Sequence, residues 1–220
     1  MNNRWFRYPG ILIALGICIC LLLGIFTPVT ATAPSADDTN QTPHQATALV
    51  LMYVVGSDLE SGNGHSEGDD GTSDLMDMIS GYGETSPDNL NIVVAYGGAA
   101  KEGWKGMTIA SIEDLKADAK NGVFGDEEIG EFHDPAMDMG SKEGLTTFLT
   151  DAREHYRGDT TYLIFWNHGD GYQGFGFDEN TDNHLSISDI TDVLEATGTR
   201  TDLIGFDACL MGGLEVAKSL

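Results

Sequence analysis

The chain has 220 residues, 41% of them hydrophobic, and carries 35 Asp and Glu against 11 Lys and Arg, for a net charge of −24. This length allows one domain with a sizeable core. The strong negative charge excludes an electrostatic nucleic-acid-binding surface and an anionic membrane surface as partners, and a solvated acidic exterior is its simplest explanation.

The N-terminal segment has the features of an export signal. Two arginines precede an apolar stretch over residues 11–26, and Ala31-Thr-Ala33 matches the small-residue pattern of a cleavage site. We predict a signal peptide over residues 1–33. Because no charge interrupts the following residues until Asp37, an uncleaved signal anchor is the alternative, although the stretch is shorter than the roughly 20 residues of a spanning helix. Either way the domain is expected to be secreted or extracytoplasmic, with membrane contact only through a retained anchor.

The first half of the mature chain begins with a linker and a buried strand. Residues 34–45 are rich in Ala, Ser, Thr, Asp and Pro, so the domain is expected to span residues 46–220. Ala48–Val55 is a continuous apolar run typical of a buried parallel strand. Residues 56–73 are predicted to be a loop rich in Gly and acidic residues. A cation could bind there, but the spacing is not that of an EF-hand, and an exposed acidic loop is favoured.

Further elements follow before the middle of the chain. A short helix containing Leu75 and Ile79 is predicted to start at Thr72 or Ser73. Leu90–Tyr96 indicates a second strand, and Trp104–Ile112 a third that could be a hairpin arm.

The second half alternates helices and strands. A helix capped by Ser141 is predicted to run to the Arg157-Gly158 stop, before a strand over Thr161–Trp166. Ser188 is predicted to cap the next helix, and Leu203–Phe206 forms the last strand. Alternating strands and helices predict an α/β fold with a mainly parallel sheet covered on both faces.

Two of these strands end on reactive side chains. One leads into His168-Gly169, and the other into Asp207-Ala-Cys209-Leu-Met-Gly212. The carboxyl ends of parallel strands open into one crevice, so imidazole and thiol are expected to come within reach of each other. The pattern predicts a Cys/His hydrolase.

The cysteine count supports a special role for Cys209. Cys18 and Cys20 lie in the predicted signal peptide, which leaves Cys209 as the one thiol of the mature domain, with no internal disulfide. A lone cysteine is commonly a buried filler. Its position after an apolar strand and close to two glycines favours a nucleophile instead.

The ordered motifs resemble the clostripain-like cysteine peptidases, family C11 of the caspase-like clan. The resemblance covers residues 46–220 and includes further landmarks in order, namely Met52–Glu60, Asp74–Met78, Asn91–Val94 and Met139-Gly-Ser141 with Leu145 and Phe148. It implies a three-layer α/β/α sandwich of the caspase-haemoglobinase type. It also implies a secreted endopeptidase whose partners are protein or peptide substrates, cleaved after Arg or Lys.

The resemblance assigns roles to the motif residues. Cys209 would be the nucleophile and His168 its acid–base partner. The backbone N–H groups of Gly169 and Cys209 would form the oxyanion hole. Asp207 matches the acidic S1 residue that binds a basic P1 side chain. A turn or cap residue at the strand end is the alternative for Asp207.

Metal binding and self-processing have weaker support. No cofactor is required for the chemistry, and Ca²⁺ is allowed by family analogy, but no metal site can be assigned. Asp170, Asp178 and His184 lie near the histidine motif without a familiar ligand spacing, so loop polarity explains them better. Between Gly169 and Asp207 the one basic residue is Arg200, just before a strand, so self-cleavage in this segment is not expected.

Three other functional classes are the alternatives to the peptidase: a non-catalytic binding module, a serine hydrolase and a metallohydrolase. The resemblance implies further strands after the helix that follows Cys209, so we expect a C-terminally truncated domain. Truncation makes an inactive, exported binding module with the caspase fold the main alternative. A serine α/β-hydrolase lacks its G-x-S-x-G elbow here, and a metallohydrolase lacks its ligand spacing.

Overall fold

A computed structural model describes residues 47–64, 67–83, 87–119, 124, 130 and 132–220. The predicted signal peptide, linker and domain start at residue 46 lie outside these residues. Within the described part, no helix is both long and apolar enough to cross a bilayer.

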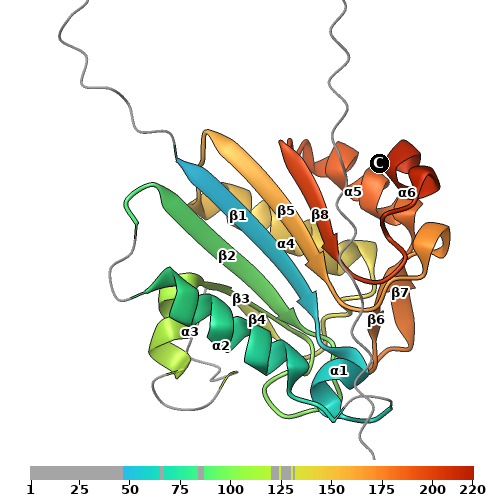
Figure 1. The fold of residues 1–220 in the computed structure, drawn as a ribbon, viewed down its shortest axis with the longest axis horizontal. Coiled ribbons are helices and arrows are strands. Elements are labelled where there is room, and N and C mark those ends of the chain that lie inside the picture. The colour runs from blue at the N-terminus through green and yellow to red at the C-terminus, as the bar shows by residue number, and fades with distance from the viewer. Residues whose placement is uncertain (1–46, 65–66, 84–86, 120–123, 125–129, 131) are drawn as a thin grey trace, which may run out of the picture. The chain divides into compact units, whose positions relative to one another are not determined.

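The described strands form one mixed sheet and one small hairpin (Figure 1). In the sheet, β1 pairs in parallel with β2 and β5, and β5 pairs in parallel with β8, whereas β3 is antiparallel to both β2 and β4. The mainly parallel sheet and the hairpin arm are therefore confirmed. In spatial order the strands are β4 (Phe132–Asp134), β3 (Met107–Ser111), β2 (Leu90–Gly97), β1 (Ala48–Val55), β5 (Thr160–Trp166) and β8 (Leu203–Asp207), and the separate antiparallel pair is β6 (Phe175–Asp178) with β7 (Asn183–Leu185).

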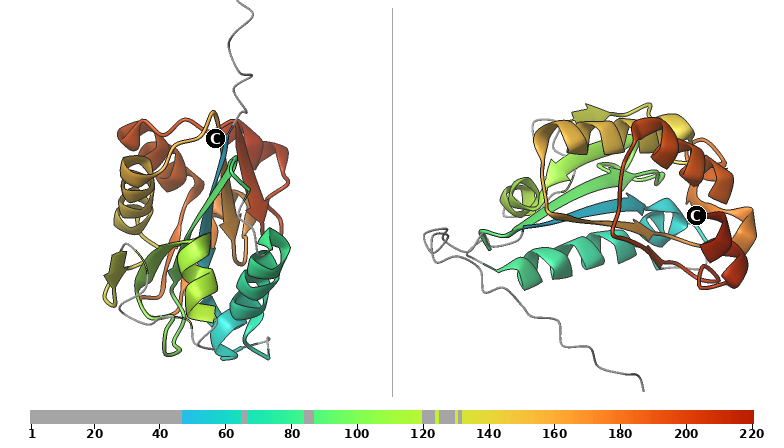
Figure 2. Two further views of the ribbon diagram at one scale, coloured as in Figure 1. Left: turned by 90° about the vertical axis from the view of Figure 1, so that its left-hand side faces the viewer. Right: turned by 90° about the horizontal axis from the view of Figure 1, so that it is seen from above.

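Helices cover both faces of the sheet, which confirms the three-layer arrangement (Figure 2). One face packs against α4 (Lys142–His155) and α5 (Ile187–Thr197), and the other against α2 (Asp70–Tyr82) and α3 (Ile112–Ala119). Two short helices, α1 (Ser57–Ser61) and α6 (Leu214–Ser219), follow β1 and β8, and a 3₁₀ turn, η1 (Gly171–Gln173), precedes the hairpin.

Strand β1 shows how one apolar run serves both layers. Its side chains alternate between the faces, as the strand period of two requires. Leu51 and Tyr53 belong to the core under α4 and α5, whereas Val54 belongs to the core under α2 and α3. Because both faces of β1 are buried, an uninterrupted apolar sequence is what this central strand needs.

The expected loop over residues 56–73 was wrong over α1 and the start of α2, whereas residues 62–64 and 67–69 belong to no helix or strand. The chain instead forms α1, and α2 already begins at Asp70. Glu60 in α1 is buried, where it pairs with Lys101 and accepts hydrogen bonds from the backbone N–H and hydroxyl of Thr72. Its acidic side chain therefore joins α1 to α2 and does not belong to an exposed loop.

Helix starts were predicted with mixed success. Ser141 caps α4 as expected and accepts a hydrogen bond from the Gly144 N–H at 3.1 Å. The predicted cap Ser188 was wrong, because Ser186 begins α5. Ser186 accepts a hydrogen bond from the Asp189 N–H, and the Asp189 carboxylate accepts one from the Ser186 N–H in return, which is a reciprocal capping box.

Candidate active site

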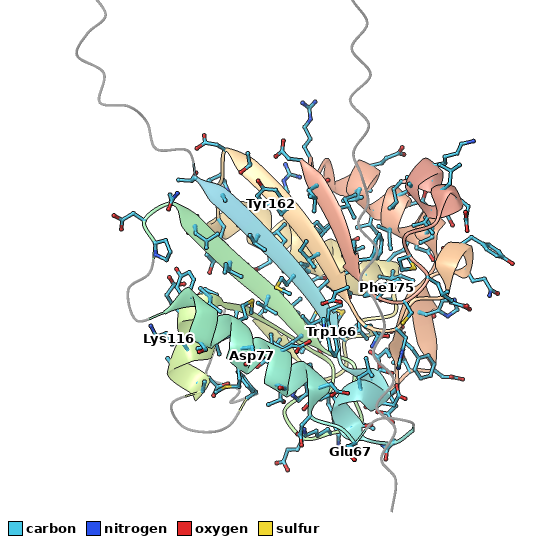
Figure 3. All side chains as sticks on the ribbon, viewed as in Figure 1. Glu67, Asp77, Lys116, Tyr162, Trp166 and Phe175 are labelled. Carbon is cyan, nitrogen blue, oxygen red and sulfur yellow. The ribbon has the colours of Figure 1, made fainter. Side chains whose placement is uncertain are left out.

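Three adjacent parallel strands deliver the residues of the candidate site to one edge of the sheet. The arrowheads of β1, β5 and β8 point to the same edge in Figure 1, beside α1 and the β6–β7 hairpin. In register, Val54 pairs with Trp166 and Trp166 with Asp207. Trp166, labelled in Figure 3, lies where these strands end. The segments that follow the three strands are therefore neighbours.

His168 and Cys209 each stand two residues beyond the paired residues Trp166 and Asp207. The two turns are in contact, because a Cβ atom built on Gly169 would lie 2.2 Å from the carbonyl oxygen of Cys209. Only glycine fits so close an approach. The thiol of Cys209 is free and exposed. The predicted convergence of the histidine and cysteine motifs is thus seen at the level of the backbone.

The imidazole of His168 has a carboxylate partner. Its side chain is half exposed, and Nε2 lies 3.0 Å from Oδ1 of Asp58 in α1. Partial burial acts to raise the pKa of Asp58, but hydrogen bonds from Ser57 and His168, together with the charge of His168, outweigh it and lower the pKa below its ordinary value. In the described residues no hydrogen bond joins the imidazole to the thiol.

Asn167 fixes the backbone that carries His168. The side chain is buried, its amide donates to the carbonyl of Val55 at the end of β1, and its Oδ1 accepts from the N–H of Phe177 in β6 at 3.0 Å. One buried amide therefore ties together the ends of β1 and β5 and the hairpin, which restricts the movement of the adjacent histidine.

Asp207 closes β8 with an exposed side chain, and its carbonyl accepts from the Asn167 N–H at 3.4 Å. A cavity of about 330 Å³ opens between the histidine turn and the hairpin. Its lining includes Gly169, Phe175, Phe177 and His184.

The sequence analysis missed two residues of this site, Asp58 and Asn167. Asp58 was assigned to an acidic loop, and Asn167 was passed over beside the histidine. The rule that pointed to His168 and Cys209 also applies to Asp58, because it follows the buried strand Ala48–Val55 in the same way. For Asn167 the signal was weaker: a polar residue directly after an apolar run.

A Ca²⁺ ion stays a prediction without an assigned site. Within the described residues, no group of three or more His, Cys, Asp or Glu side chains is arranged to hold a metal ion. Asp178 is fully buried and accepts hydrogen bonds from the backbone N–H groups of Met139 and Asn180. That contact supports the interpretation of Asp178 as a structural polar residue.

The chain is similar in sequence to known cysteine peptidases. The model of the clostripain family, peptidase family C11, matches residues 53–220. Clostripain from Hathewaya histolytica is 30% identical over 169 residues, which cover 66% of this chain and 32% of the relative.

Solved structures share the fold. A secreted C11 cysteine protease from Bacteroides thetaiotaomicron, in complex with an irreversible peptide inhibitor, superposes with a TM-score of 0.58 at 24% identity, covering 80% of this chain and 46% of that one. An inactive zymogen of a C11 protease from Parabacteroides distasonis gives a TM-score of 0.55 at 21% identity, covering 81% and 46%. The chain thus spans about a third of the curated relative and about half of the solved chains.

Proposed function

Because this chain belongs to the clostripain family of C11 cysteine peptidases, we propose that it supplies the catalytic residues of a secreted cysteine endopeptidase that cleaves peptide bonds after Arg or Lys. The observation that carries the proposal is the close approach of Gly169 to the carbonyl of Cys209, where the histidine turn lies against the cysteine turn. The chemistry requires these two turns to face one scissile bond.

In the proposed reaction, the Cys209 thiol gives its proton to His168, and the thiolate attacks the substrate carbonyl carbon. The backbone N–H groups of Gly169 and Cys209 stabilise the oxyanion, and His168 then passes the proton to the leaving amine. Water hydrolyses the resulting thioester and restores the thiol. In cysteine and serine enzymes without substrate, such acid–base hydrogen bonds are often long and tighten on binding, which fits the unpaired thiol here.

Asp207 is proposed to bind the basic P1 side chain. It lies two residues before the nucleophile and its carboxylate is exposed to an incoming ligand. A carboxylate pairs with a guanidinium in a two-pronged arrangement and with an ammonium as a point charge, so Arg is expected to be preferred over Lys.

Secretion is proposed from the N-terminal pattern of residues 1–33. The structural relative with the bound peptide inhibitor is itself described as secreted. An exported peptidase with a single mature thiol also avoids competing disulfides in an oxidising medium.

The test uses the full chain with fluorogenic peptides carrying Arg, Lys, Leu or Asp at P1. Arg substrates should be cleaved fastest, and an Arg chloromethylketone should label Cys209 and abolish turnover. Cys209→Ala should remove activity while leaving the folded state intact by circular dichroism. Asp207→Asn should lower kcat/KM for Arg substrates about 30-fold, which corresponds to about 2 kcal/mol in activation free energy, while Cys209 still reacts with iodoacetamide.

Two results would contradict the proposal. A folded chain in which Cys209 resists the affinity label, and which cleaves none of the peptides, would indicate a non-catalytic module with the same fold. Cleavage after Leu or Asp that depends on Cys209 would support the cysteine peptidase activity but contradict the preference for a basic P1 residue.

A further inference from the structure

The order of the strands places His168 between two groups. In the sheet, β5 lies between β1 and β8, so the segment after β5 has the segment after β1 on one side and the segment after β8 on the other. These flanking segments carry Asp58 and Cys209. Figure 1 shows that β1, β5 and β8, which are neighbours in the sheet, end at the same edge. A carboxylate, an imidazole and a thiol therefore follow three adjacent strands.

We propose that Asp58 is a positioning residue that holds the imidazole of His168 by Nε2 and thereby assigns the proton transfer to Nδ1. The inference rests on the peptidase function proposed above and adds a third participant to it. The main support for this proposal is the hydrogen-bond distance of 3.0 Å between His168 Nε2 and Asp58 Oδ1.

The protonation of this contact follows from its chemistry. The lowered pKa of Asp58 keeps its carboxylate ionised at neutral pH, and an ionised carboxylate only accepts hydrogen bonds. The proton in the contact therefore belongs to Nε2. In the neutral ring, Nδ1 is then the unprotonated nitrogen that can accept the thiol proton. Nε2 keeps its own proton throughout, while Nδ1 receives a proton from Cys209 and returns it to the leaving amine.

The carboxylate is itself held in place. Ser57 donates its hydroxyl to Asp58 Oδ1 at 3.0 Å, and Gly64 passes so close that an added Cβ would lie 2.4 Å from Oδ2. Ser57 is buried and adopts a φ of +52°, a left-handed conformation that is costly for a residue other than glycine. The chain thus accepts strain immediately before Asp58, where β1 turns into α1.

Other titratable side chains in this part of the structure differ from Asp58 in their contacts. Asp170 lies in the same turn but accepts from the Gln173 amide, and His184 lines the cavity on the hairpin side. Glu179 accepts from the Ala100 N–H and the Asn63 amide. Of these groups, Asp58 is the one joined to His168 by a hydrogen bond in the described structure.

The experiment measures kinetics and the tautomer of His168 in the full chain. Asp58→Ala should lower kcat for Arg substrates by about 10- to 100-fold with KM changed less than about twofold, because the ring is misoriented while substrate binding is kept. The tautomer is measured by ¹⁵N NMR in the Cys209→Ala background, at a pH where the His168 ring is neutral. With Asp58 in place, His168 should show the Nε2–H form. With Asp58→Ala added, it should show a mixture of the Nε2–H and Nδ1–H forms.

Controls separate positioning from folding. Asp58→Asn keeps the shape of the side chain and provides a folded variant if Asp58→Ala does not fold. It should retain part of kcat, because its amide oxygen still accepts a hydrogen bond from Nε2. Asp182→Asn removes the same charge at an exposed position with φ of +57°, which asparagine tolerates, and should leave kcat and tautomer unchanged.

The outcomes distinguish the two proposals. Wild-type kcat together with an unchanged Nε2–H form in folded Asp58→Ala overturns the role of Asp58. If the alanine variant does not fold, wild-type kcat in Asp58→Asn overturns it, while loss of activity in Cys209→Ala would still support the peptidase. Full activity in Cys209→Ala would instead overturn the peptidase function itself.

Discussion

Gly169 is the position where a single methyl group is expected to disturb the site most directly. Its missing side chain allows the histidine turn to lie against the Cys209 carbonyl, and Met211 packs on the same spot. Gly169→Ala should therefore lower stability by about 1–3 kcal/mol and reduce kcat/KM at least about tenfold, since the two turns must separate. Thermal unfolding and peptide cleavage measure both effects.

A matched control lies in the neighbouring turn. Nothing comes within 4 Å of a Cβ built on Gly212, so Gly212→Ala should change stability by less than about 0.5 kcal/mol. If both variants behave alike, the close approach at Gly169 contributes nothing to stability or activity, and it does not support the proposed active site.

Single residues were predictable from the sequence where a reactive side chain followed a buried run. His168 and Cys209 stood out because histidine and cysteine rarely occur at such positions without a reason. Asp58 follows its strand in the same way and lies within the landmark Met52–Glu60, but acidic residues are so common in this chain that no separate role was assigned to it. Its partner on another strand becomes visible only when the strand order is known.

At the scale of elements, the start of α5 depends on one hydroxyl. Ser186 caps the helix with the reciprocal contact to Asp189. Ser186→Ala should therefore destabilise the domain by about 1 kcal/mol in chemical denaturation, because it leaves a first-turn N–H without its acceptor. Ser188→Ala, two residues later, should lower the stability markedly less. Equal losses in the two variants would contradict the assignment of the cap.

Long elements were predicted well and short ones poorly, for a physical reason. Ala48–Val55 and the helix after Ser141 bury many side chains, so their patterns are strong. Helix α1 has five residues and is held by tertiary contacts such as Glu60 with Lys101, which leave no periodic trace. The predicted strand to Ile112 ends at Ser111, where the Ser111 hydroxyl accepts from the Asp114 N–H and begins α3.

For the whole molecule, the α/β class followed from the alternation of elements, but the position of each strand did not. The sequence contains nothing local that places β5 between β1 and β8. Burial of β1 on both faces fits its central position in that order. The strand order is also what creates the site, since the same elements in another order would separate the thiol from the imidazole.

The acidic composition also leads to a prediction about the whole molecule. Asp58, Asp189 and Glu179 each have a pKa below the ordinary value. Partial burial acts to raise each pKa, but the hydrogen bonds that each carboxylate accepts outweigh it. Electrostatic attraction to His168 lowers the pKa of Asp58 further, and attraction to Lys142 lowers that of Asp189. A group with a lowered folded pKa stabilises the fold above its unfolded pKa, and this contribution disappears as the pH falls through the folded pKa. Stability should therefore change little from neutral pH to about pH 5 and fall as the pH drops below 4.5 and 3.8, the ordinary values of these groups.

Thermal unfolding between pH 7 and pH 2.5 checks this expectation. Asp189→Asn removes one of the groups, so its Tm should lie below that of the native chain at neutral pH and approach it in acid. Asp182→Asn, at an exposed position, should follow the native curve at every pH. A native Tm that rises on acidification would mean that relief of repulsion among the 35 acidic side chains outweighs the loss of these native contacts. In that case the acidic surface, and not its hydrogen-bonded carboxylates, would set the pH range of the protein.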